Sequence, residues 1–275
     1  MPTKGLSGNL RRMAHDGAEL PGLRLLAKPV YRRLFARGTL PNNSYFGVYG
    51  SFDEALAEAP KALPTGFDLP RAAGLYRDRL DSILVGDYPV VFWLSQLFMS
   101  GQCTLFDLGG HIGISYYGFK SYVTYPDDLK WQVYDLPEVV SAGRTWASQH
   151  NAGHGLSFTL SLDDASGCAI LLASGVLQYL GFSLPEMLRS LREPPRHVLI
   201  NVTPLHPSRS FFTLQQIGFS SCPYRVMALP EFLADMEALG YTAVDRWESF
   251  ERYMRIPFES DHSIDRYYGF HFQRG

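Results

Sequence analysis

The run TLFDLGGHIG at residues 104–113 constrains the fold more than any other stretch of this 275-residue chain. Apolar residues on both sides of Asp107 predict a short buried strand, and the glycines that follow predict a sharp turn. A helix that begins near Ile112 would direct its unpaired N–H groups and its positive dipole end toward that turn. The run therefore predicts a strand–turn–helix unit with a ligand site at the carboxyl edge of a parallel sheet.

The position of Asp107 inside the motif distinguishes two kinds of nucleotide site. In the dinucleotide fingerprint G-x-G-x-x-G the backbone approaches a pyrophosphate, which a carboxylate at this place would repel. A carboxylate would attract an ammonium group instead. The spacing Asp-x-Gly-Gly-His-x-Gly resembles motif I of the Rossmann-like S-adenosylmethionine (SAM) methyltransferases, where the acid and the glycine turn hold the methionine end of the cofactor. An ordinary turn without a ligand is the alternative, and His111 stands where glycine or asparagine is often found.

A second acidic residue, Asp135, follows the next expected strand in the run WQVYDLPEVV. Pro137 suits the first turn of a helix, so this carboxylate would stand at a junction of strand and helix. There it can accept both hydroxyls of a ribose, because a carboxylate offers two acceptor oxygens. The triplet Asp-Leu-Pro at this separation from Asp107 resembles the small-molecule O-methyltransferases. The alternative is that Asp135 only caps the helix that begins at Pro137.

The rest of the chain continues the alternation of strands and helices. Further strands are expected at 156–162, 168–173, 197–202, 241–247 and 267–272, and helices at 71–84, 88–99 and 230–239. The order resembles the SAM methyltransferase topology. It implies an α/β three-layer sandwich with a seven-stranded, mostly parallel sheet whose last strand is antiparallel. We expect residues 1–100 to form an N-terminal helical cap and residues 101–275 the SAM-binding domain, with an inserted lid or acceptor wall at 203–229.

The resemblance implies a SAM pocket along the carboxyl edge of this sheet. The residues expected to contact the cofactor are Asp107, Gly109, Gly110, His111 and Gly113 for the methionine part, Asp135 and Leu136 for the ribose, and Leu160, Ser161, Leu162, Ala173 and Ser174 for the adenine and the methyl-bearing edge. The residues expected to face the methyl acceptor are Gln178, Tyr179, His206, Tyr224 and Arg225.

Gln178 departs from the plant-type small-molecule O-methyltransferases, which carry a proton-accepting histidine in the matching run after the fourth strand. A glutamine cannot be a general base. Three alternatives remain open. Another base could serve, such as His206 or His111; the acceptor could already be nucleophilic, as an amine or a carboxylate is; or the protein could bind SAM without turning it over.

The expected function is methyl transfer from SAM to a small-molecule or saccharide acceptor, most simply by O-methylation. The run FGVYGSFDEA, the motif I region and the late run TLQQIG…CPYRV resemble a methyltransferase family of bacterial surface-polysaccharide gene clusters. One alternative is a catalytically degenerate SAM-fold binding module. An NAD(P)-dependent oxidoreductase is a weaker alternative, because the glycine spacing is wrong and no Tyr-x-x-x-Lys signature is present.

Composition excludes several other classes. The net charge of −2 gives no overall basic field for nucleic acid. The 3 cysteines have neither a metal-binding spacing nor a disulfide framework, which suits a reducing compartment. The first residues lack the apolar core of a signal peptide. We therefore expect a cytoplasmic protein that binds no structural metal.

The N-terminal segment carries an uneven share of the charge. Residues 1–40 hold eight basic residues against Asp16 and Glu19, and apolar residues recur at helical spacing within 21–37. Such a helix could make weak contact with an anionic membrane surface. It could equally cap the domain or pair with a second copy in a homodimer, with its basic face in water.

Overall fold

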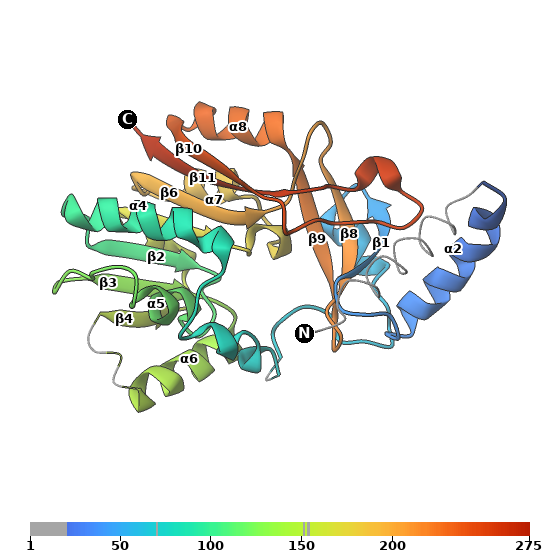
Figure 1. The fold of residues 1–275 in the computed structure, drawn as a ribbon, viewed down its shortest axis with the longest axis horizontal. Coiled ribbons are helices and arrows are strands. Elements are labelled where there is room, and N and C mark those ends of the chain that lie inside the picture. Colours follow the sequence, from blue (N-terminus) through green and yellow to red (C-terminus); the bar gives the residue numbers. More distant parts are fainter. Residues whose placement is uncertain (1–20, 70, 151, 153–154) are drawn as a thin grey trace, which may run out of the picture.

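A seven-stranded sheet carries the fold (Figure 1) in a computed structural model that describes residues 21–69, 71–150, 152 and 155–275. The strands, in spatial order, are β10 (Tyr241–Ser249), β11 (Tyr267–Arg274), β6 (His197–Thr203), β5 (Ile170–Ser174), β2 (Thr104–Leu108), β3 (Lys130–Tyr134) and β4 (Leu156–Thr159). The pairs from β6 to β4 are parallel, whereas β11 is antiparallel to both of its neighbours. The α/β fold class expected from the sequence is confirmed.

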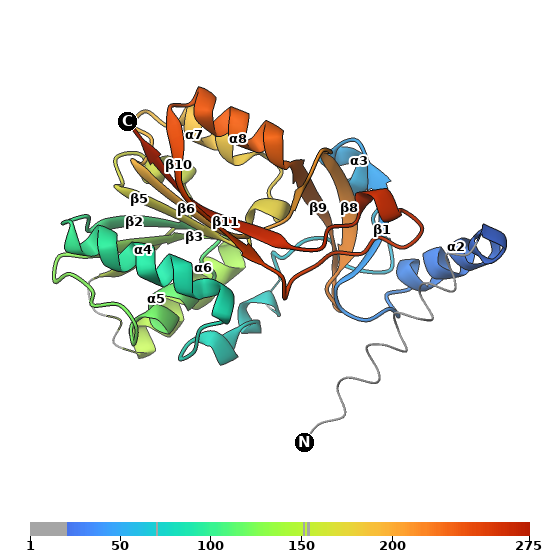
Figure 2. The same ribbon diagram turned by 45° about the horizontal axis from the view of Figure 1, so that its top comes forward.

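Helices cover both faces of this sheet, which is why its central strands are apolar on both sides (Figure 2). Buried residues of α4 (Tyr88–Met99), α5 (Ile114–Phe119) and α6 (Pro137–Gln149) pack on one face, around Trp131 and Leu105. Buried residues of α7 (Leu184–Ser190) and α8 (Leu229–Ala238) pack on the other face, around Phe106. The three-layer arrangement follows, and it leaves the carboxyl ends of the parallel strands free for a site.

A second, four-stranded sheet corrects two expectations. It comprises β1 (Ser44–Tyr49), β8 (Phe211–Gln216), β9 (Ser221–Ala228) and β7 (Leu205–His206), in that spatial order. The stretch 203–229, expected to be an inserted lid or acceptor wall, is thus largely strand. The N-terminal segment, expected to be a helical cap, contributes a strand as well as helices. These strands were hard to predict because they contain buried polar residues. Gln216, for example, is fully buried, and its side-chain amide donates to the carbonyl of Phe35 at 2.8 Å.

The stretch 71–84 is also not the single helix expected. It contains two short 3₁₀ helices, η1 (Ala72–Gly74) and η2 (Arg77–Arg79), separated by Tyr76 in a left-handed conformation. Further 3₁₀ turns are η3 (Val85–Asp87), η4 (Leu162–Ala165), η5 (Leu177–Tyr179) and η6 (Ser260–His262). The strand expected to reach Leu162 therefore ends at Thr159.

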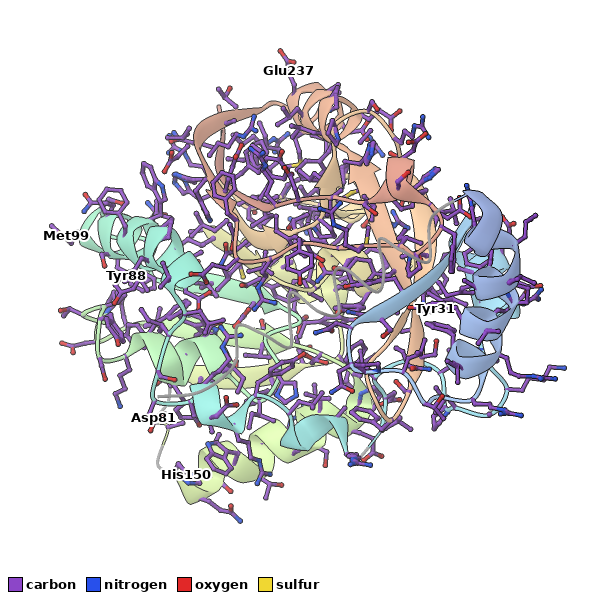
Figure 3. All side chains as sticks on the ribbon, turned by 45° about the vertical axis from the view of Figure 1, so that its right-hand side comes forward. Tyr31, Asp81, Tyr88, Met99, His150 and Glu237 are labelled. Carbon is purple, nitrogen blue, oxygen red and sulfur yellow. The ribbon has the colours of Figure 1, made fainter. Side chains whose placement is uncertain are left out.

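The N-terminal helices pack beside the second sheet. Tyr31 of α2 (Pro21–Ala36) lies on the side facing β1 and donates to the carbonyl of Tyr45 at 3.1 Å (Figure 3). Ser51 caps α3 (Phe52–Ala57) by accepting the backbone N–H of Glu54. No helix in the described part of the chain is long and apolar enough to cross a bilayer.

Candidate functional site

The glycine turn after β2 wraps around the carboxyl group of Asp107. A Cβ atom on Gly110 would lie 2.4 Å from that carboxyl, so only glycine lets the backbone pass this close. Gly109 and Gly113 adopt φ of 69° and 90°, and His111 adopts a φ of 58°. This left-handed φ explains why glycine or asparagine would also suit the position of His111.

Asp107 is a buried acid that lacks a cationic partner among the described residues. Its carboxylate accepts the indole N–H of Trp131 at 3.0 Å, and its side chain is 1% exposed. Burial raises the pKa of Asp107 to about 7, an effect that the Trp131 hydrogen bond opposes and the charge of Asp135 increases. A cation placed beside this carboxyl would restore its ionised form.

Asp135 follows β3 directly and locks the turn in place. Its two carboxylate oxygens accept the backbone N–H groups of His111 at 2.9 Å and Leu136 at 2.8 Å. Burial raises the pKa of Asp135, and these backbone N–H groups counteract the rise. Because β2 and β3 are parallel neighbours, both acids lie at the same sheet edge, on either side of one turn.

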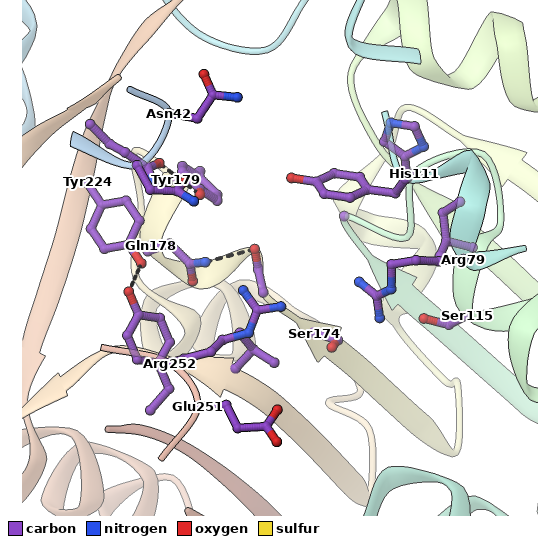
Figure 4. Close-up of a pocket in the computed structure, with 18 of the residues that line it drawn as sticks. Asn42, Arg79, His111, Ser115, Ser174, Gln178, Tyr179, Tyr224, Glu251 and Arg252 are labelled. Carbon is purple, nitrogen blue, oxygen red and sulfur yellow. Dashed lines mark hydrogen bonds between the residues drawn. The ribbon is translucent and has the colours of Figure 1, made fainter. Parts of the chain in front are cut away.

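A cavity of about 600 Å³ opens in front of this edge, between the two sheets (Figure 4). Arg79, His111 and Ser115 stand on one side of it, and Gln178, Tyr179 and Tyr224 on the other. The volume is in the range of small-molecule sites.

Eight residues expected from the sequence line the cavity: Asp107, Gly109, Gly110, His111, Ser174, Gln178, Tyr179 and Tyr224. Those that do not line it are Gly113, Asp135, Leu136, Leu160, Ser161, Leu162, Ala173, His206 and Arg225. The residues 160–162 nonetheless follow β4 directly, so they share the sheet edge with Asp135.

His206 and Arg225 are engaged elsewhere. The ring of His206 lies 3.0 Å from the carbonyl of Asp261 through Nε2, while Nδ1 accepts two backbone N–H groups. Both ring nitrogens of His206 already have hydrogen-bond partners, so His206 has no free lone pair with which to take a proton from the methyl acceptor. Side chains alternate along β9, so Tyr224 faces the cavity while Arg225 stacks on Phe212 with its guanidinium 5.0 Å from the ring centre.

His111 is held in one tautomer. Its Nε2 lies 2.9 Å from the carbonyl of Ala72, and this nitrogen must be the donor because a carbonyl only accepts. Nδ1 then carries the lone pair, and it has no partner among the described residues. Burial lowers the pKa of His111, which keeps the ring neutral at pH 7.

Gln178 presents an unpaired acceptor. Its Nε2 donates to the carbonyl of Gly175 at 2.9 Å, which fixes the amide and leaves Oε1 without a partner among the described residues. The side chain is only 4% exposed. An unsatisfied buried acceptor costs about 1–3 kcal/mol, so a ligand that donates an O–H or N–H here would recover that cost.

Phenols and amides form the wall that the second sheet contributes. Tyr224 and Tyr267 are joined through their hydroxyls at 2.7 Å, and Gln215 accepts from Tyr179 at 2.9 Å while donating to Tyr45 at 3.0 Å. Burial raises the pKa of Tyr179 and of Tyr224 well above the ordinary value. These phenols therefore remain protonated and act as hydrogen-bonding groups, never as bases.

Sequence reasoning missed further lining residues, among them Asn43, Tyr76, Arg79, Val202, Arg252 and Arg255. Except for Val202, which ends an expected strand, their elements are misassigned or unassigned from sequence, so no spacing connects them with motif I. A backbone signal connects several of them. Of the five non-glycine residues with positive φ in the described chain, four line this cavity: Asn43, Tyr76, His111 and Val202. Strained backbone of this kind gathers at functional sites.

This chain is similar to several solved structures, but no protein-family model and no curated protein sequence matches it. The chain is similar to the CcbJ methyltransferase from Streptomyces caelestis, at 12% identity and TM-score 0.48, covering 76% of this chain and 97% of that one. It is also similar to an O-methyltransferase family protein from Burkholderia thailandensis, at 19% identity and TM-score 0.45, covering 74% of this chain and 60% of that one. A third is 1,6-didemethyltoxoflavin-N1-methyltransferase of the same organism with bound 1,6-didemethyltoxoflavin and S-adenosylhomocysteine, at 16% identity and TM-score 0.43, covering 69% and 78%.

Proposed function

We propose that this chain is a SAM-dependent methyltransferase that methylates a small-molecule acceptor, most simply on oxygen. The observation that carries the proposal is the pair of carboxylates, Asp107 and Asp135, on either side of one glycine turn. SAM presents an ammonium and a ribose diol, and these residues suit both. Asp107 is a buried acid whose raised pKa calls for a cation, and a carboxylate with two acceptor oxygens suits a diol.

Each part of the cofactor has a chemical counterpart along the sheet edge. Asp107 would bind the ammonium group, and Arg79 would bind the carboxylate, because its Nε is buried without a partner among the described residues. Asp135 and Leu136 would hold the ribose. Residues 160–162 would border the adenine, since they follow β4 beside Asp135.

SAM brings its own methyl group and leaving group, so the chain's task is to bind, orient and exclude water. Alignment of two reactants in one cavity is worth roughly 7–11 kcal/mol of barrier. Gln178 would accept a hydrogen bond from the acceptor's O–H or N–H and so turn the reacting lone pair toward the methyl group. His111 is the one histidine among the described residues that line the cavity, and its Nδ1 would serve as the neutral base, whereas an amine acceptor would need no base before attack.

Calorimetry with S-adenosylhomocysteine (SAH) and NAD tests the cofactor. SAH should bind, and Asp135→Ala should weaken it at least about a hundredfold, because the ribose loses its acceptor and the turn loses the hydrogen bonds from His111 and Leu136 that hold it. The matched control is Asp127→Ala, an exposed acid that precedes β3 at the opposite sheet edge. Binding of NAD without SAH would replace the proposal by an oxidoreductase.

Turnover is tested with SAM that carries a labelled methyl group and a panel of sugars, glycolipid precursors and phenols. Label transferred to any of them establishes the enzyme and identifies the acceptor. Tight SAH binding without a labelled product across the panel would favour a SAM-fold binding module.

A further inference from the structure

Two arginines line the cavity from the connection between β10 and β11. Arg252 and Arg255 are both solvent-exposed, and no carboxylate of the described residues lies within ion-pair distance of either. The acid nearest to Arg255 in electrostatic effect is Asp265, but its carboxylate is occupied by Arg266 at 3.0 Å. Both guanidiniums are therefore available to a ligand.

The segment that carries these arginines is anchored rather than loose. Met254 and Ile256 are 0% and 1% exposed and pack in the core of the second sheet with Tyr224. Met254 also exchanges two backbone hydrogen bonds with Ile264, at 2.9 and 3.0 Å. Because the buried residues flank Arg255 and follow Arg252, the fold fixes the backbone positions from which both side chains reach the cavity.

The other charged residues of the cavity either have partners already or leave a net positive charge. Arg79, which enters from the opposite side in Figure 4, pairs with Asp87 at 2.9 Å. Asp107 belongs to the motif I turn. The remaining charged lining residues are Arg252, Arg255 and Glu251, which leave one net positive charge on the acceptor side. An acceptor with an acidic group would neutralise it.

The rest of the acceptor side is polar. The unpaired Oε1 of Gln178, the amides of Asn42 and Asn43 and the phenols of the second sheet offer donors and acceptors to several hydroxyls. A flat apolar acceptor would leave these groups unpaired, which is unfavourable in a confined cavity.

From these observations we infer that the methyl acceptor is a small polyhydroxylated anion, such as a sugar phosphate or a uronic acid. Arg252 and Arg255 bind its acidic group while Gln178 receives the reacting O–H. Methyl transfer from bound SAM would join the acceptor oxygen to the methyl carbon and leave the electron pair of the S–CH₃ bond on sulfur. The proton of the hydroxyl would then leave to Nδ1 of His111 or to water. The inference rests on the proposed function, which supplies the cofactor.

Calorimetry of the full chain tests the inference, with glucose, glucose 1-phosphate and glucuronate titrated with and without saturating SAH. At least one of the two anions should bind at least about tenfold more tightly than glucose, since charge-assisted hydrogen bonds are roughly twice as strong as neutral ones. The phosphate and carboxylate arms decide which acid is preferred. The double variant Arg252→Gln/Arg255→Gln should abolish the preference and leave the affinity for SAH unchanged.

The matched control is Arg192→Gln/Arg196→Gln, which removes two exposed arginines just before β6, at the opposite sheet edge. It should retain the preference for the anion. Equal binding of glucose and both anions, no binding of either anion, or an anion preference that survives in Arg252→Gln/Arg255→Gln would overturn the inference. Absence of SAH binding is a separate result, which refutes the proposed function while the titrations without SAH still report on the arginines.

Discussion

At the scale of single residues, Asp107 shows a conflict between stability and binding. The residue is 1% exposed and its carboxyl accepts one indole N–H, so ionisation of this carboxyl costs the folded state free energy. Its folded-state pKa of about 7 lies above the ordinary value near 4. The folded state therefore holds the proton more tightly than the unfolded state does. The resulting contribution to stability is complete below about pH 4 and is lost as the pH rises through about 7.

The substitution Asp107→Asn should make the free protein more stable at pH 8, because an amide of the same shape carries no charge to desolvate. We expect the melting temperature to rise by a few degrees at pH 8 and to change little at pH 5. Thermal unfolding at the two pH values, with Asp127→Asn as the exposed control, measures this. A variant that melts below the original chain at pH 8 would contradict the assignment of a buried ionised acid.

The same residue predicts proton release on binding SAH. At pH 6 the carboxyl of Asp107 is mostly protonated in the free protein, and a bound ammonium group would favour the carboxylate. Calorimetry at pH 6 in two buffers of different ionisation enthalpy should therefore show a net loss of protons. Asp107→Asn should bind SAH more weakly and release none from this site. Identical heats in both buffers for the original chain would refute this prediction.

At the scale of elements, sequence reasoning succeeded where one periodicity dominates. The strands β2 and β5 are largely apolar because they are covered on both faces, and β3 alternates with Trp131 and Val133 buried, so Asp107 and Asp135 stand out at the strand ends. It failed for β8 and β9: the buried Gln215 and Gln216 of β8 donate hydrogen bonds to residues about 170 to 180 positions away. Such partners leave no local signal, so the sequence predicts an inserted lid or acceptor wall at 203–229 and not a pair of strands.

The same limit applies to the site. The half built on motif I follows from local spacing, since Gly110 and Asp107 are neighbours in the sequence. Arg252 reaches the cavity only because β10 and β11 pair at the sheet edge and Met254 anchors the connection. The position of Arg252 beside the cavity depends on tertiary structure, and no sequence motif predicts it.

An element-scale prediction concerns the second sheet. Leu214 of β8 is 1% exposed and packs with Phe35 and Ala55, which joins the N-terminal helices to the sheet. Leu214→Ala should lower the free energy of unfolding by about 2–5 kcal/mol, because it leaves a cavity. The SAH affinity should be retained, since the large sheet has its own cores. Urea denaturation measures the loss, and Val244→Ala, at an exposed site on β10, is the control.

At the scale of the whole molecule, one buried polar network joins segments that are far apart in the sequence. Asn201 of β6 donates to Asp87 at 3.1 Å and accepts the indole N–H of Trp247 of β10 at 2.9 Å. Asp87, just before α4, also binds Arg79 of η2 at 2.9 Å. The network therefore ties two strands of the large sheet to the arginine that we propose for the carboxylate of SAM.

The substitution Asn201→Leu tests whether this network supports both stability and binding. Leucine has a similar volume but leaves Asp87 without one donor and Trp247 without its acceptor, so the free energy of unfolding should fall by at least about 2 kcal/mol. SAH affinity should fall as well, because Asp87, the partner that positions Arg79, loses one of the donors that hold its carboxylate. Asn201→Asp should be worse at pH 7 and partly recover at pH 5, since it places a second carboxylate against Asp87. Urea denaturation and SAH calorimetry on the two variants measure these effects, and full SAH affinity in a destabilised Asn201→Leu would separate Arg79 from the cofactor site.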